Sequence, residues 1–169
     1  MTDDSRNSRE VLIVAANKWA YECFRKYSAY ICQTDRSFRP EVDRIGYSCE
    51  GAIQAEFPTI LERRDHVGFN YETSRKLQLS GNPFDAAFAT IIERAIADGR
   101  DNIPGQVFLL SPPDSRLTLR IAQPITNTER SETGRPIAWT QGHRYVQESA
   151  ILAGPRTTDE LAEFRATDT

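Results

Sequence analysis

The chain has 169 residues, of which 39% are hydrophobic and 27% are charged, and its formal net charge at pH 7 is −3. This length and composition are typical of one globular domain and exclude a disordered or fibrous protein, and the net charge implies no general attraction to nucleic acid. The apolar run at 11–16 is far shorter than a membrane span, and the polar first ten residues do not form a signal peptide, so we expect a cytoplasmic protein without membrane association.

The first half of the chain predicts a strand, a helix and a group of short strands. Residues 1–9 are polar, and we expect a flexible tail there. The apolar run at 10–16 is typical of a buried strand. Asn17 is a suitable N-cap for a helix over 18–33, where apolar residues recur at steps of three and four. A loop at 33–41 is followed by strand patterns at 44–49, 53–57 and 66–71.

The second half contains one clear helix and several further strand patterns. Asn82 and Pro83 are suitable residues to begin a helix over 84–98, and Gly99 suits its C-terminal turn. The segment before this helix, 72–83, has no pattern that we can assign. Strands are predicted at 105–111, 117–125 and 136–140, with a polar hairpin-type loop at 126–135. The spacing of Thr157 and Glu160 matches a capping box and predicts a short C-terminal helix.

The order of these elements predicts the fold class. Strands occur in groups, and the two main helices are separated by three of them, so the regular alternation of a parallel α/β fold is missing. We therefore expect an α+β fold, in which a mixed or antiparallel curved sheet, able to close into a small pseudo-barrel, packs against two main helices and a short C-terminal helix. One domain would span 10–155, followed by the helix and tail at 156–169.

Several enzyme and metal classes lack their motifs here. The sequence contains no glycine-rich dinucleotide or Walker motif, no Gly-x-Ser-x-Gly elbow and no zinc-deaminase signature. Cys23, Cys32 and Cys49 form no Cys-x-x-Cys pair, and only two histidines accompany them, so a closed zinc site is not expected. We expect buried thiols, no metal, no cofactor and no catalytic residue that the sequence identifies.

The loop after the first predicted helix contains the first candidate binding residues. Arg36 and Arg39 lie on either side of Phe38, so two guanidinium groups could hold a phosphate while the aromatic ring stacks on a base. The alternative is a solvated loop whose arginines interact with the carboxyl end of the helix.

The segment LERRDH, residues 61–66, contains the second candidate group. Asp65 precedes His66, and a carboxylate beside an imidazole can support general-base chemistry. Neighbouring side chains in a turn usually point apart, so the alternative is a set of exposed ion pairs.

The third candidate is the segment AWTQGHRYV. It contains five residues that could form the lip of a binding site: Trp139, Gln141, His143, Arg144 and Tyr145. Aromatic rings can stack on a base while amide, imidazole and guanidinium groups contact its edge or its phosphate. The alternative is a tight turn leading into one more strand, with Trp139 in the core and His143 and Arg144 in solvent.

The layout of the chain resembles the PUA-like group of small domains, which includes the EVE and ASCH families. The segments that carry the resemblance are EVLIVAA, IGYSCEGAI, QVFLLS and AWTQGHRYV, within residues 10–150. The resemblance implies an α+β pseudo-barrel, and it implies binding of RNA or of modified DNA bases in a cleft.

From these observations, our leading hypothesis is a non-catalytic module that recognises a nucleotide, a modified base or a short nucleic-acid segment. A protein-interaction or regulatory subunit is the first alternative, because interface hot spots are rich in Trp, Tyr and Arg. A metal-independent hydrolase that uses His66 or His143 is the second alternative.

Overall fold

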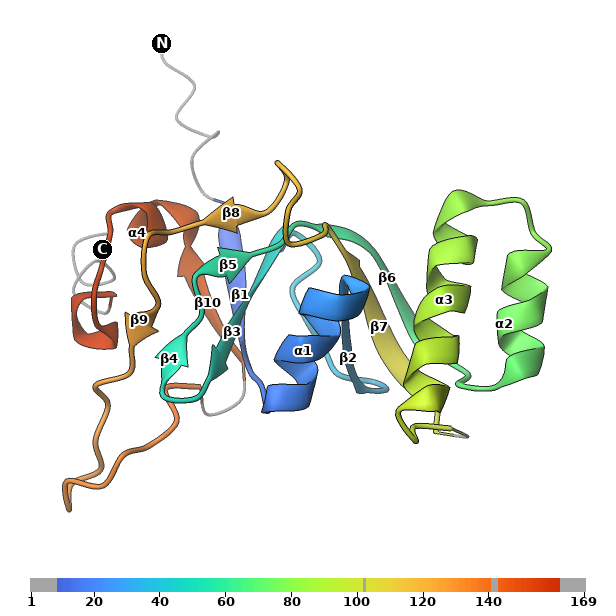
Figure 1. The fold of residues 1–169 in the computed structure, drawn as a ribbon. Helices are drawn as coiled ribbons and strands as arrows, with labels where there is room; N and C mark the ends of the chain where they lie inside the picture. Colours follow the sequence, from blue (N-terminus) through green and yellow to red (C-terminus); the bar gives the residue numbers. More distant parts are fainter. Residues whose placement is uncertain (1–8, 102, 141–142, 162–169) are drawn as a thin grey trace, which may run out of the picture.

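The structure is a computed structural model that describes residues 9–101, 103–140 and 143–161. Figure 1 shows a curled sheet at one end, a second sheet in the middle and a helical hairpin at the other end. Parallel and antiparallel strand pairs both occur in the curled sheet, so the predicted α+β class with a mixed, curved sheet is confirmed.

The curled sheet has five strands in the order β10-β1-β3-β4-β9. Their bounds are β1 Glu10–Ala15, β3 Arg44–Cys49, β4 Ala52–Ile53, β9 Ile125–Thr126 and β10 His143–Gln147. Central strand β1 is parallel to β3 and antiparallel to β10. Four consecutive residues of β1, from Val11 to Val14, are completely buried, because both faces of this strand are covered.

The second sheet is antiparallel, with the order β2-β7-β6, and a separate two-stranded pair joins β5 to β8. The bounds are β2 Ala29–Gln33, β5 Glu56–Phe57, β6 Ile60–Val67, β7 Gly105–Leu110 and β8 Leu119–Arg120. Helices α2 (Tyr71–Gln78) and α3 (Pro83–Ala97) form the hairpin at the β6 side of this sheet (Figure 1). Val107 of β7 and Phe88 of α3 belong to one buried cluster, which joins the sheet to the hairpin.

The predicted helix starts are confirmed. Asn17 caps α1 (Lys18–Tyr27), because its Oδ1 accepts the backbone N–H of Ala20 at 2.8 Å. Asn82 caps α3 in the same way, and Gly99 has the predicted left-handed conformation, with φ of 83°. At the C-terminal end, the Glu160 N–H donates to the hydroxyl of Thr157, as the capping box requires, and a helix begins at residue 158.

The predicted helix over 18–33 is wrong in its second half. Helix α1 ends at Tyr27, because Ser28 has a left-handed φ of 55°, and residues 29–33 form β2 against β7. Ala29 and Tyr30 are almost completely buried in that sheet. Ile31 fits the helical apolar stripe equally well, and tertiary pairing decided the outcome.

Four strand predictions also need correction. The pattern at 53–57 is divided between β4 and β5, which belong to different sheets. The strand lies at 60–67 and not at 66–71, and two bulges in its pairing with β7 remove the alternation of polar and apolar residues. Tyr71 instead begins α2, which the sequence left unassigned. Of 117–125, only the short strands β8 and β9 form, and residues 136–140 contain an isolated bridge at Pro136 but no strand.

Two elements near the C-terminal end were not predicted as such. The residues after Gly142 form β10, which pairs with β1. This is the additional strand that the alternative interpretation of AWTQGHRYV predicted. The short helix α4 (Glu148–Leu152) follows immediately and was missed. None of the described helices is long and apolar enough to span a bilayer.

Candidate ligand-binding site

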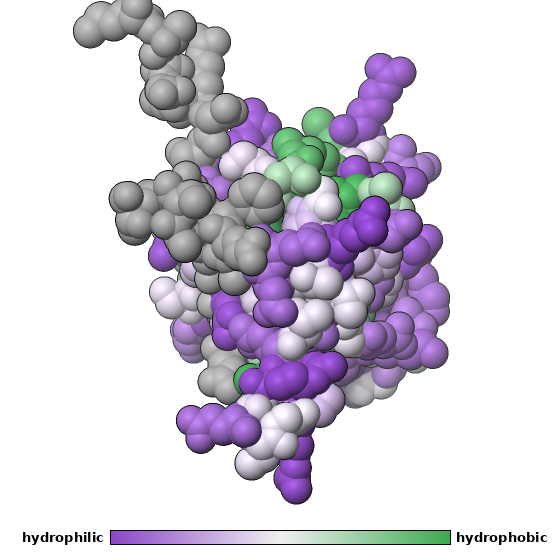
Figure 2. Space-filling view, turned by 90° about the vertical axis from the view of Figure 1, so that its left-hand side faces the viewer, coloured by the Kyte–Doolittle hydropathy of each residue, from purple (hydrophilic) through white to green (hydrophobic). Residues whose placement is uncertain are grey.

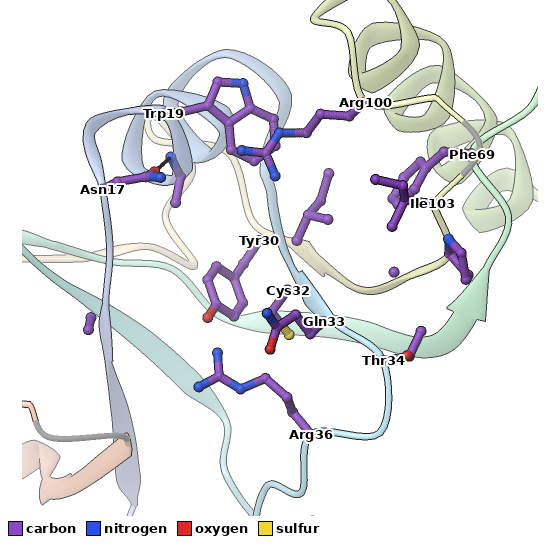
Figure 3. Close-up of a pocket in the computed structure, with 15 residues that line it drawn as sticks. Asn17, Trp19, Tyr30, Cys32, Gln33, Thr34, Arg36, Phe69, Arg100 and Ile103 are labelled. Atoms are coloured by element: carbon purple, nitrogen blue, oxygen red, sulfur yellow. Dashed lines mark hydrogen bonds between the residues drawn. The ribbon is translucent and has the colours of Figure 1, made fainter.

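A cleft of about 610 Å³ lies between α1, β2 and the segment that precedes β7. Helix α1 contributes Trp19 and strand β2 contributes Tyr30, while Arg36 comes from the loop after β2. Arg100 lies against Trp19, and Phe69 lines another side of the cleft, as Figure 3 shows. Ligand-binding pockets commonly have volumes of roughly 300–1,000 Å³, so this cleft can take a small organic molecule.

The polar groups on the β2 wall are neutral at neutral pH. Tyr30 is only 3% exposed, and burial raises the pKa of its hydroxyl, although the Arg36 guanidinium acts in the opposite direction. Burial likewise raises the pKa of the Cys32 thiol to about 11. Because thiolates and not thiols are nucleophiles, this wall is suited to hydrogen bonding and not to covalent chemistry.

Among the residues that the structure describes, the formal charges that line the cleft are all positive. These lining residues include Arg36 and Arg100 but no aspartate or glutamate. Among the described residues, no carboxylate forms an ion pair with Arg36. The N-terminus of α1 also borders the cleft and adds the partial positive charge of a helix end. This distribution favours an anionic ligand.

Aromatic surface lies beside these positive charges. The Cζ atom of Arg100 is 3.4 Å from the ring centroid of Trp19, and the indole N–H of Trp19 donates to Asp98 at 3.2 Å. Figure 3 shows this stacked pair on one side of the cleft, and it shows the Arg36 guanidinium near the Tyr30 hydroxyl on the other. The cleft therefore offers stacking surfaces and guanidinium groups together.

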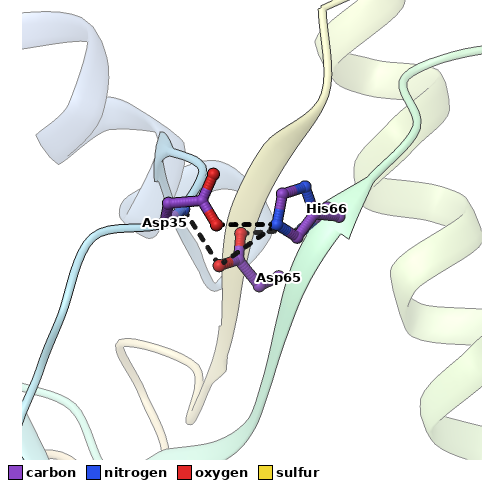
Figure 4. A group of neighbouring side chains, drawn as sticks. All are labelled: Asp35, Asp65 and His66. Atoms are coloured by element: carbon purple, nitrogen blue, oxygen red, sulfur yellow. Dashed lines mark hydrogen bonds and ion pairs between the residues drawn. The ribbon is translucent and has the colours of Figure 1, made fainter.

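Asp35, Asp65 and His66 form a second polar group, whose side chains point toward one another (Figure 4). Asp35 stands between Thr34 and Arg36, which both line the cleft. The His66 Nε2 atom is 2.9 Å from Asp35 Oδ1 and 3.9 Å from Asp65 Oδ2. The structure thus brings together residues from two candidate segments that are thirty positions apart. Among the described residues, the side-chain donors of these three form the group that could hold a metal ion.

Asp65 is the organising residue of this group. Its Oδ1 accepts the backbone N–H of His66 at 2.7 Å, and its Oδ2 accepts the backbone N–H of Asp35 at 3.0 Å. Desolvation acts to raise the pKa of Asp65, but these two hydrogen bonds, together with the His66 imidazole and a hydrogen bond from Gln106, leave the pKa below its usual value. Asp35 and His66 themselves have left-handed φ angles of 63° and 53°.

The predicted residues of the first candidate separate in the structure. Arg36 lines the cleft, whereas Arg39 lies against Tyr145, with its Cζ atom 4.2 Å from the ring centroid. Arg39 also donates to Glu10 at 2.6 Å, and its backbone N–H donates to the Tyr145 hydroxyl at 3.1 Å. Arg39 and Tyr145 therefore meet each other, but neither lines the cleft.

The predicted lip at 139–145 is divided between two faces of the curled sheet. Trp139 is buried in the core with Val146, and the Arg144 guanidinium packs over its ring at 4.8 Å and pairs with Glu129 at 3.1 Å. Tyr145 packs on the opposite face, because neighbouring residues of a strand alternate. Gln141 and the side chain of His143 lie outside the described residues. Ligand binding by this segment stays a prediction.

Sequence reasoning missed most of the cleft. Trp19 was placed on the first helix without a role, and Tyr30 was assigned to a helix instead of a strand. Phe69 and Arg100 fall in connecting segments that have no motif. The only signal that pointed to the cleft was Arg36, in a loop with several polar residues.

The outer surface gives less guidance than the cleft. Figure 2 shows the face at the β9 and β10 end of the molecule, where hydrophilic side chains predominate and one small hydrophobic group lies near the top.

A comparison with protein-family models, with curated proteins and with solved structures found no match to this chain. The function is therefore argued from the residues of the cleft.

Proposed function

We propose that the protein is a recognition module that binds a nucleotide or a modified base in the cleft between α1, β2 and β7. The observation that carries this proposal is the lining of the cleft, in which two guanidinium groups and several aromatic rings occur with no carboxylate among the described lining residues. The whole chain has a net charge of −3, so the positive charge of this lining does not follow from the overall composition. It is also the kind of function that the resemblance to PUA-like domains implies.

We propose that Arg36 binds the phosphate group of the ligand. Its planar guanidinium can donate two parallel hydrogen bonds to phosphate oxygens, and no acidic partner among the described residues competes for it. Trp19 and Phe69 provide the apolar ring surface for a base. Tyr30 and Thr34 are neutral hydrogen-bonding groups for the polar edge of the ligand.

The test is a calorimetric titration with nucleosides, nucleoside monophosphates and short oligonucleotides. We expect monophosphates or oligonucleotides to bind more tightly than nucleosides, because only they engage Arg36. Arg36→Gln should weaken their binding by about tenfold to a hundredfold, the equivalent of about 1.5–3 kcal/mol for a charge-assisted hydrogen bond. Arg144→Gln is the matched control, since Arg144 is paired with Glu129 outside the cleft, and it should bind like the parent.

The same titration separates the rival functions. Equal affinities for the parent and for Arg36→Gln would contradict the proposal, and loss of binding in Arg144→Gln alone would return the site to the 139–145 segment. Turnover of the nucleotide would favour the hydrolase. No binding of any nucleotide, together with a protein that co-purifies in stoichiometric amount, would favour the interaction subunit.

A further inference from the structure

We propose that Asp35, Asp65 and His66 form a binding site for a divalent transition-metal ion. One carboxylate oxygen from each aspartate and one imidazole nitrogen all lie within 4.8 Å of one another (Figure 4). The site goes beyond the proposed nucleotide recognition and does not depend on it.

The spacing of the donor atoms suits a single ion. Metal–ligand bonds to histidine nitrogen and carboxylate oxygen are about 2.0–2.2 Å long, so two donors on one ion lie about 3–4 Å apart. His66 Nε2 is 2.9 Å from Asp35 Oδ1 and 3.9 Å from Asp65 Oδ2. Only small side-chain rotations are needed to place all three donors around one centre.

The backbone brings these donors together across an intervening strand. Strand β7 lies between β2 and β6, so the loop after β2 must pass the end of β7 to place Asp35 beside β6. On the β6 side, Arg64 pairs with Val107 and Val67 pairs with Gly105, which leaves Asp65 and His66 in a bulge. A bulge redirects side chains away from the regular pleat, and this one directs His66 toward Asp35.

The charge of the group calls for a cation. Other carboxylates of the protein pair with arginines, as Glu10 does with Arg39 and Glu148 with Arg44. Within the described ranges, the only ion-pair partner of Asp35 and Asp65 is the imidazole of His66. Two carboxylates therefore converge without a lysine or arginine, and a divalent ion would neutralise both.

The donor set indicates the class of ion. One imidazole nitrogen with two carboxylate oxygens suits Zn²⁺, Co²⁺ or Mn²⁺, whereas Mg²⁺ and Ca²⁺ prefer sites made of oxygen alone. The three residues are exposed, so the remaining coordination positions are open to water or to an anion. Sequence reasoning missed this site because it searched for the closed cysteine and histidine sets of structural zinc.

The test is a titration of the full chain with Co²⁺, followed by its visible absorption and by calorimetry, and repeated with Zn²⁺ and Mg²⁺. We expect one Co²⁺ per chain, displaced by Zn²⁺ and not by Mg²⁺. Asp35→Asn and His66→Gln should each weaken binding by at least about tenfold, since even loss of outer-shell partners has that effect. Asp114→Asn is the matched control, because it removes the same charge from an exposed turn, and it should bind like the parent.

A second measurement needs no variant and so does not depend on folding of the mutants. Mn²⁺ at a low molar ratio should broaden the backbone amide signals of residues 34–36, 64–67 and the adjoining 105–106 in a ¹H–¹⁵N spectrum before those of any other segment. Unsaturable Co²⁺ binding, equal binding by Asp35→Asn and the parent, or broadening centred elsewhere would each overturn the proposal.

Discussion

The cleft and the segment 139–145 contain the same kinds of residue and arrange them in opposite ways. The residues of the cleft are spread from α1 to β7 along the chain, yet they converge on one space. The residues of the segment are contiguous, yet Arg144 and Tyr145 lie on opposite faces of β10. A dense group of aromatic and basic residues in a sequence therefore does not by itself make a site.

The pairing of the arginines is the second difference between the two regions. Arg144 has a carboxylate partner in Glu129, whereas Arg36 has none in the described part of the chain. An arginine that is already paired must break that contact before it binds a phosphate, which lowers the affinity that it can provide. Local sequence does not reveal this, because Glu129 and Arg144 are fifteen positions apart.

The largest expected effect is the difference in stability loss between alanine substitutions of the two tryptophans. Trp139 is 1% exposed, so Trp139→Ala should lower the free energy of unfolding by about 3–5 kcal/mol, as truncation of a buried aromatic does. Trp19 is only partly buried, so Trp19→Ala should cost clearly less stability while weakening nucleotide binding. Urea denaturation measures the first effect and calorimetric titration the second. Equal losses of stability would break the distinction between a core residue and a cleft residue.

The next effect concerns the buried thiol of Cys23 in the core behind the cleft. Burial raises the pKa of the Cys23 thiol to about 12, well above its ordinary value. The unfolded chain therefore loses this proton first, and stability should fall as pH rises from about 9 toward 12. The expected loss is on the order of 2 kcal/mol at a pH about 1.5 units above the unfolded pKa.

Urea denaturation between pH 8 and pH 10.5 measures this loss. The informative quantity is the slope against pH, which should become smaller in Cys23→Ala. Cys32→Ala should reduce the slope almost as much, because a thiol whose pKa is raised to about 11 also keeps its proton in the folded chain over this pH range. An identical slope in the parent and in Cys23→Ala would show that the thiol does not titrate as its burial implies.

A smaller effect concerns the two arginines. Arg144 and Glu129 are both partly exposed, so a double-mutant cycle of Arg144→Gln with Glu129→Gln should give a coupling of about 1 kcal/mol or less. The equivalent change Arg36→Gln should leave the urea midpoint almost unchanged, because no ion pair is lost. A large stability loss in Arg36→Gln would show that Arg36 is a structural residue and would weaken the case for the cleft.

The smallest effect concerns the junction between α1 and β2, the strand that lines the cleft. Ser28 has a left-handed φ of 55° at the junction of α1 and β2. Glycine adopts this conformation without steric cost, so Ser28→Gly should raise the free energy of unfolding by about 0.5 kcal/mol. Ala29→Gly at the first residue of β2 is the control and should destabilise instead. A loss of stability in Ser28→Gly would contradict this account of the junction.

Local sequence determined much of the framework. The run at 10–16 specifies a strand buried on both faces, and Asn17, Asn82 and Gly99 mark helix ends through hydrogen bonds that involve only neighbouring residues. The grouping of strands also fixed the α+β class. These features depend on interactions within a few positions of the chain, which is why they could be predicted.

Tertiary structure alone decided the boundary at Ser28, the cleft and the Asp35–Asp65–His66 group. The second half of the predicted helix became β2 because its apolar residues could pair with β7, which lies more than seventy positions away along the chain. Arg36 lines the same cleft as Tyr30 and Trp19 only after that strand has formed. Asp35 reaches His66 only because β6 is bulged, and the bulge depends on pairing with β7. Long-range strand pairing is chosen by the burial of whole faces, and no local pattern encodes it.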